Sequence, residues 1–135
     1  MIFQVFYASS SLFEIDNPVD LEILKQARRN NSRLELTGCL FRSRNYFAQL
    51  LEGPRDSVEA TMAKIRADVR HFDIFEWPQS EAPARTFKDW DMGFAAQAQG
   101  DAILLALKHA DQQPVAAVVN NLKNLFATQF NAVPD

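Results

Sequence analysis

The stretch Tyr46-Phe47-Ala48-Gln49-Leu50-Leu51-Glu52-Gly53 has the pattern of a hydrophobic strand with one neutral amide in its middle. A primary amide carries two donors and an oxygen acceptor, and each group left unpaired in the interior costs about 1–3 kcal/mol. Gln49 is therefore expected to meet a hydrogen-bond partner. Tyr7, at the end of the first predicted strand, has a suitable hydroxyl, and the amide could relay a hydrogen bond from it to a heterocycle.

The hydrophobic periodicity and the turn residues on both sides of this strand predict a βαββαββ order over residues 1–97. Asn17 followed by Pro18 is typical of a helix start, and we expect that helix to stop at Asn30-Asn31. Pro54 opens a second helix. The predicted strands are Ile2–Tyr7, Leu36–Phe41, Tyr46–Leu51, Phe72–Trp77 and Arg85–Met92. This order predicts a ferredoxin-like α+β domain with its two helices on one face of the sheet.

The sequence predicts a C-terminal helical extension over residues 98–135. Asp101 is expected to cap a short helix through Ala110, and Pro114 to open a longer helix with an apolar stripe from Val115 to Phe126. The first strand is apolar on both faces, so the sheet needs cover on the side away from its own helices. We expect the C-terminal pair to pack there.

Composition narrows the class of protein. The chain has 135 residues, enough for one domain, and a net charge of −3 with a pI near 5.3 gives no electrostatic footprint for nucleic acid or a membrane. One cysteine allows no internal disulfide and fits a reducing compartment. The sequence has no basic leader, no membrane-length apolar run, no phosphate loop and no Cys/His cluster with metal-ligand spacing. A cytoplasmic protein without a metal is expected.

An ordered set of motifs resembles the BLUF domain, the blue-light sensor that uses FAD, over residues 1 to about 95. The motifs are Tyr7-Ala8-Ser9, Asn30-Asn31, Leu36-Thr37-Gly38, Phe47 to Gly53, Asp68-Val69-Arg70-His71 and Phe87 to Phe94. The resemblance implies the ferredoxin-like fold, non-covalent FAD between the two helices, and a short member without a fused output enzyme. Asn30 departs from the pattern, because some members place an aromatic residue or histidine there.

The resemblance also implies roles for individual residues. Asn31 and Gln49 would donate to the flavin edge that carries N5 and the C4 carbonyl. Lys64 and Asp68, four residues apart and expected on one face of the second helix, would serve the opposite edge. Arg28 and Arg29 would be candidates for the phosphates. The implied photoactive residues are Tyr7, Gln49, Trp90 and Met92. The implied cofactor-binding residues are Tyr7, Ile23, Leu24, Arg28, Asn31, Gln49, Lys64, Asp68, Arg70 and His71.

The function that follows is light sensing without substrate turnover. A change at Gln49 would pass through Trp90 and Met92 to the C-terminal helices, and from there to an effector protein, with a homo-oligomer expected. One alternative is a small acylphosphatase-like hydrolase on the same fold, which would need a glycine loop that the sequence lacks. Another is an RNA-reading sheet, which the negative net charge opposes.

Overall fold

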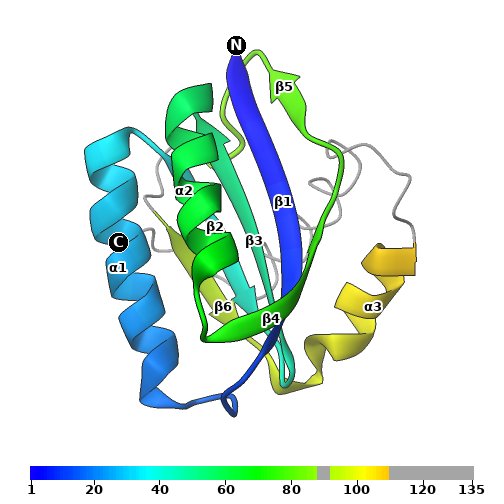
Figure 1. Cartoon of the computed structure of the whole chain (residues 1–135). Helices are drawn as coiled ribbons and strands as arrows, with labels where there is room; N and C mark the ends of the chain where they lie inside the picture. Colours follow the sequence, from blue (N-terminus) through cyan, green and yellow to red (C-terminus); the bar gives the residue numbers. More distant parts are fainter. Residues whose placement is uncertain (88–91, 110–135) are drawn as a thin grey trace.

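The computed structural model describes residues 1–87 and 92–109 (Figure 1). The elements in chain order are β1 (Ile2–Ser11), α1 (Pro18–Leu34), β2 (Thr37–Arg42), β3 (Tyr46–Gly53), α2 (Arg55–Ala67), β4 (His71–Glu76), β5 (Ser80–Ala82), β6 (Gly93–Ala96), the 3-10 turn η1 (Ala98–Gly100) and α3 (Asp101–His109). The predicted longer helix after Pro114 lies outside the described residues. No helix in the described part is long and apolar enough to cross a membrane.

The sheet has the strand order β4-β1-β3-β2-β6, with the short β5 paired to the start of β1. All neighbouring strands are antiparallel except β2 and β6, which run parallel. Figure 1 shows α1 and α2 on one face of the sheet and α3 on the other. The predicted ferredoxin-like α+β architecture is confirmed, and β5 and the parallel β6 are additions that the sequence patterns did not reveal.

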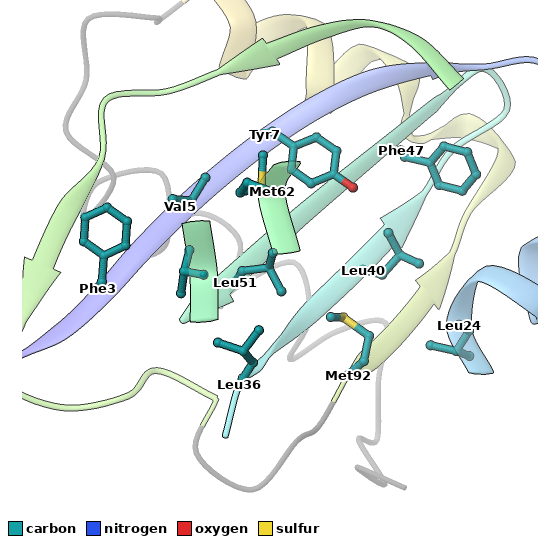
Figure 2. Close-up of a cluster of buried hydrophobic side chains, with 11 residues drawn as sticks. Phe3, Val5, Tyr7, Leu24, Leu36, Leu40, Phe47, Leu51, Met62 and Met92 are labelled. Atoms are coloured by element: carbon teal, nitrogen blue, oxygen red, sulfur yellow. The ribbon is translucent and has the colours of Figure 1, made fainter. Parts of the chain in front are cut away.

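Strand alternation divides the interior into two cores. The helix-side core, between the sheet and helices α1 and α2, contains Tyr7, Leu24, Leu51, Met62 and Met92 among others (Figure 2). The α3-side core contains the alternate strand residues together with Trp77, Phe87 and Leu104. Because successive side chains of a strand point to opposite faces, β3 contributes to both cores.

Helix α1 begins as predicted but ends later. The Asn17 side chain accepts a hydrogen bond from the backbone N–H of Val19 at 3.0 Å, and Pro18 follows as the first helical residue. The predicted end at Asn30-Asn31 is wrong, because the helix continues to Leu34, which packs against the helix-side core. Glu35, with φ of 61°, closes the helix in the left-handed region and donates its N–H to the carbonyl of Asn31.

The predicted strand Arg85–Met92 is also wrong in its described part. The backbone N–H groups of Thr86 and Phe87 donate to the Glu52 carboxylate, at 2.8 and 2.6 Å, instead of to a neighbouring strand. The last strand, β6, begins only at Gly93 and pairs with β2 from Cys39 onward. A side chain has taken the hydrogen bonds that a strand ladder would have used.

Asp101 joins α3 to the turn between β2 and β3. Its carboxylate accepts hydrogen bonds from the Ser43 hydroxyl and from Asn45, whose backbone N–H lies at 3.1 Å and whose side-chain amide at 2.7 Å. The backbone at Gly100 packs closely against Phe41 of β2. A Cβ at this position would lie only 2.6 Å from the Phe41 ring. Asp101 was expected to cap its own helix, and its side chain instead fixes α3 to the hairpin.

We predict that Asp101→Ala lowers the free energy of unfolding by about 1–2 kcal/mol at neutral pH, because charge-assisted hydrogen bonds near the surface are lost. Burial alone would raise the pKa of Asp101, but the hydrogen bonds from Ser43 and Asn45 hold it below the usual value. The contribution is therefore present above about pH 4 and disappears as the pH falls through the folded-state pKa.

Urea titrations of both proteins at pH 7 and pH 3 measure this effect. Glu14→Ala, at an exposed carboxylate in the loop before α1, is the matched control. A difference between wild type and Asp101→Ala that is as large at pH 3 as at pH 7 would contradict the assignment.

Candidate functional site

Tyr7 and Gln49 form a buried hydrogen bond at the centre of the sheet. They are direct cross-strand partners in the antiparallel pair of β1 and β3, so both side chains point to the same face. The Tyr7 hydroxyl donates to Gln49 Oε1 at 2.5 Å, and Tyr7 is 4% and Gln49 6% exposed. Burial, together with the negative charge of Asp68, raises the pKa of Tyr7 above its usual range. The hydroxyl therefore keeps its proton at any physiological pH.

The other end of the Gln49 amide points to Met92. Gln49 Nε2 lies 3.7 Å from the Met92 sulfur, which is fully buried in the helix-side core. A thioether is a weak acceptor, so this contact stabilises the amide nitrogen only slightly. The same amide lines a cavity, where a stronger acceptor could replace the sulfur.

That cavity has a volume of about 530 Å³ and lies between the sheet and the helices α1 and α2. Its walls combine flat or aliphatic side chains with polar groups at the edges. The apolar lining residues are Ile23, Ala27, Leu40, Phe47 and Ile65, together with the ring of Tyr7. The polar lining residues are Gln26, Arg29, Asn30, Asn31, Arg33, Gln49, Thr61, Lys64, Asp68, Arg70 and His71. A planar, mostly apolar molecule with polar edges would suit such a lining.

Phe47 forms a wall of the cavity and is held from behind by Arg42. The Arg42 guanidinium lies 4.7 Å from the centre of the Phe47 ring and bonds the Asp20 carboxylate at 3.1 Å. Arg42 has no exposed surface, and Asp20 lies in the first turn of α1. The ion pair thus fixes the start of α1 to the end of β2 and restrains the aromatic wall.

His71 has both ring nitrogens bound by the protein. One nitrogen, Nε2, lies 2.7 Å from the backbone carbonyl of Ile65, and Nδ1 lies 2.6 Å from the Ser9 hydroxyl. A carbonyl can only accept, so Nε2 carries a proton and donates to Ile65, while Nδ1 and the Ser9 hydroxyl share the second hydrogen bond. The ring stands edge-on to Tyr7, with the ring centres 6.2 Å apart. His71 therefore shapes the cavity wall beside Tyr7.

Asp68 and Arg70 form a pair at the mouth of the cavity. The Arg70 guanidinium donates to both Asp68 oxygens, at 2.5 to 3.1 Å, and also to Gln26 of α1 at 2.9 Å. These hydrogen bonds from Arg70 lower the pKa of Asp68. The expected placement of Lys64 and Asp68 on one face of a helix is wrong, because α2 ends at Ala67 and Asp68 follows in extended conformation. Both residues nevertheless line the cavity.

The two adjacent asparagines occupy different positions. Asn31 is 1% exposed and belongs to the buried stripe of α1 with Leu24. Asn30 donates to the Thr61 hydroxyl of α2 at 3.2 Å and accepts from Arg33 at 3.1 Å, so it bridges the two helices. The side chains of Arg29, Arg33 and Lys64 add positive charge around the cavity, and all three residues are exposed.

The structure brings most of the predicted site residues to this cavity, and three of them lie elsewhere. Leu24 is buried in the helix-side core, as is Met92. Arg28 donates from Nε to the Met92 carbonyl at 3.1 Å. Trp90 lies outside the described residues. The predicted residues that line the cavity are Tyr7, Ile23, Asn31, Gln49, Lys64, Asp68, Arg70 and His71.

Some lining residues were not identified from the sequence. They include Gln26, Ala27 and Arg33 of α1 and Thr61 of α2. Their helical spacing from the predicted residues was the available signal. Ala27 follows Ile23 by four residues, Gln26 and Arg33 flank Asn30 at similar intervals, and Thr61 precedes Lys64 by three.

Comparison with known proteins identifies the family. Residues 2–93 match the family described as BLUF, sensors of blue light using FAD. The Blue light- and temperature-regulated antirepressor BluF of Escherichia coli (strain K12) is 39% identical over 74 residues, which are 53% of this chain and 18% of that protein. The Photoactivated adenylate cyclase subunit beta of Euglena longa is 33% identical over 76 residues, 56% of this chain and 9% of that protein.

A solved structure extends the likeness to nearly the whole chain. The dark-state structure of BlrB, a BLUF protein, has a TM-score of 0.73 and 27% identity, and the match covers 94% of this chain and 96% of that one. By contrast, the chain spans less than a fifth of the length of the two curated relatives. On the family match over residues 2–93, the chain belongs to the BLUF family, the sensors of blue light that use FAD as their cofactor.

Proposed function

We propose that this chain is a blue-light photoreceptor that binds FAD non-covalently in the cavity and signals through the Tyr7–Gln49 hydrogen bond. The observation that carries the proposal is the position of that bond. A tyrosine hydroxyl and a buried amide are joined at 2.5 Å in the cavity wall, so the amide stands between the hydroxyl and any bound ring.

The residues present fit a flavin. Phe47, Leu40 and Ile65 offer apolar surface for a planar ring, and the amides of Gln49 and Asn31 can donate to acceptors at its edge. Exposed Arg29 and Arg33 are suited to the phosphates of the dinucleotide, since guanidinium groups bind phosphate oxygens well. Of the two arginines expected from the sequence to bind the phosphates, Arg28 has its Nε on a backbone carbonyl, so Arg29 is the better candidate, together with Arg33.

Bound FAD would supply the absorption of blue light and, once excited, a strong oxidant. Tyr7 is placed to release an electron and then its hydroxyl proton, with Gln49 Oε1 as the acceptor at 2.5 Å. Return of both to Tyr7 would leave the Gln49 amide rotated or tautomerised. Because the contact from Nε2 to the Met92 sulfur is weak, losing that contact in the change would cost little.

The output is proposed to be a change in protein association and not turnover of a substrate. Residues 1–97 would form the flavin-binding unit, and residues 98–135 would carry the signal to an effector protein. The relatives named as an antirepressor and as a cyclase subunit agree with a sensor that regulates other activities. We propose a homo-oligomer, with a dimer as the simplest form. The hydrolase alternative has no support from the family match.

We predict that the purified protein is yellow or takes up added FAD, and that blue light shifts its absorption reversibly to the red while the flavin stays oxidised. Absorption spectra before, during and after illumination measure this. The physical reason is that a rearranged Gln49 amide donates differently to the ring edge. A protein that binds no flavin, or one whose flavin bleaches without a red shift, would refute the proposed function.

Gln49→Leu and Tyr7→Phe should each keep FAD and lose the red shift. Leucine has nearly the size of glutamine but no hydrogen-bonding group, and phenylalanine has no hydroxyl proton and is harder to oxidise. Matched controls are Gln26→Leu at the cavity mouth and Tyr46→Phe, the other tyrosine, and both should retain the shift. A full red shift in either Gln49→Leu or Tyr7→Phe would mean that the relay has been assigned to the wrong residues.

Light should change the C-terminal part of the protein. Hydrogen exchange measured in the light and in the dark is expected to differ most in residues 88–94 and 101–130, because these follow Gln49 along the proposed route. Size-exclusion chromatography under illumination reports any change in assembly. Equal exchange in both regions with an unchanged elution volume would contradict the proposed output.

A further inference from the structure

Glu52 is a fully buried carboxylate on β3, three residues after Gln49, and both of its oxygens accept hydrogen bonds. Oε1 accepts from the Gln4 amide at 3.0 Å and from the Thr86 backbone N–H at 2.8 Å. Oε2 accepts from the Thr37 hydroxyl at 3.4 Å and from the Phe87 backbone N–H at 2.6 Å. A buried carboxylate is tolerated only with such partners, so this arrangement is tightly specified.

The segment that Glu52 holds is fixed a second time by Arg85. The Arg85 guanidinium donates to the Thr37 hydroxyl at 3.0 Å, to the Glu52 carbonyl at 3.1 Å and to the Glu35 carbonyl at 2.7 Å. Since Thr37 receives a hydrogen bond from Arg85, its own proton is available for Glu52. Residues 85–87 are therefore attached to β2 and β3 through both backbone and side chains.

The described residues on the two sides of 88–91 belong to different cores. Phe87 packs in the α3-side core with Leu104, whereas Met92 packs in the helix-side core with Tyr7. At the far end, Met92 bonds Arg28 through its carbonyl and contacts Gln49 through its sulfur. One strand, β3, thus contacts the described residues on both sides of 88–91, Thr86 and Phe87 through Glu52 on one face and Met92 through Gln49 on the other.

We infer that Glu52 is a positioning residue for the contact between Met92 and Gln49, an inference that rests on the proposed function. By fixing the backbone at Thr86 and Phe87, Glu52 sets the point from which the chain reaches Met92. The sulfur position, and with it the environment of the Gln49 amide, depends on this anchor.

Glu52 would act at a distance from the bound cofactor. Glu52 lies on the face of the sheet opposite the cavity and does not line it. A change at Glu52 should therefore leave FAD binding intact and act on the photocycle through Met92. The same anchor also places Phe87 in the α3-side core, to which Leu104 of α3 belongs, so Glu52 is connected to the described C-terminal helix as well.

The test is Glu52→Gln in the full chain, loaded with FAD. Glutamine has the same length but only one oxygen acceptor, and its NH2 group must face groups that are themselves donors. The attachment of Thr86 and Phe87 to β3 should loosen. The rate of dark recovery should then change by about fivefold, which corresponds to roughly 1 kcal/mol in the barrier. FAD affinity should change by less than about twofold, within the spread for a distant site.

A second readout distinguishes positioning from general loosening. The chain contains three methionines, Met1, Met62 and Met92, so methyl-¹³C methionine labelling gives three resolved signals without further mutation. Met62 lies in the same helix-side core as Met92 but on α2. In Glu52→Gln the Met92 methyl signal should move while that of Met62 stays, in the dark and with or without FAD.

Glu81→Gln is the matched control, because Glu81 is an exposed strand carboxylate and should change neither signal nor recovery. If Glu52→Gln does not fold, Thr37→Val removes only the hydroxyl between Arg85 and Glu52 and should move the Met92 signal in the same direction, by less. An unmoved Met92 signal with wild-type recovery, or equal shifts of Met62 and Met92, would overturn the inference.

These outcomes separate the inference from the proposed function. If wild type shows no red shift at all, the proposed function fails. If wild type shows it and Gln49→Leu abolishes it, while Glu52→Gln behaves as wild type in both readouts, only the role of Glu52 fails.

Discussion

The hydrogen bond between Tyr7 and Gln49 depends on the register of β1 against β3, and the site depends on that bond. Tyr7 faces Gln49 directly in the antiparallel pair, so the hydroxyl and the amide meet without any special loop. A slip of one residue would turn every side chain of one strand to the other face and separate the pair. Phe47 and Leu51, two residues to either side of Gln49, pack with Tyr7 in the helix-side core and support this register. Packing in the core therefore helps to set the geometry of the Tyr7–Gln49 hydrogen bond.

The two faces of β3 divide the work of the molecule. On the helix side, Gln49 looks into a cavity whose other walls come from α1 and α2. On the α3 side, Glu52 gathers donors from three further parts of the chain. The β2–β3 hairpin adds a third connection, through Asp101 at the start of α3. The strand β3 is therefore connected to α3 at two places, through the core that Phe87 shares with Leu104 and through the hairpin turn.

Features that depend on the residues nearby in the sequence could be predicted. The hairpin, the two helices and the Tyr7–Gln49 pair follow from alternation, capping residues and the need of a buried amide for a partner. The end of α1 was placed too early, because Asn31 resembles a helix-terminating residue but is buried inside the last turn. The strand expected at Arg85–Met92 could not be excluded from the sequence, since its backbone bonds are taken by Glu52, more than 30 residues away.

The cavity was predictable only in part. Residues with a distinctive chemistry, such as Asn31 and His71, were found through the family motif, whereas Ala27 and Thr61 are ordinary helix residues until the fold places them. The contacts that occupy His71 on both nitrogens were not predictable, because Ser9 and Ile65 come from different elements.

NMR of the side-chain amide tests whether light changes the hydrogen bonding of Gln49. Protein labelled with ¹⁵N in glutamine side chains is observed in the dark and under blue light, and the Gln49 signal is assigned by its loss in Gln49→Leu. We expect this signal to move under illumination and to return in the dark with the time course of the absorption change. A Gln49 signal that stays unchanged while the absorption shifts fully to the red would contradict the account.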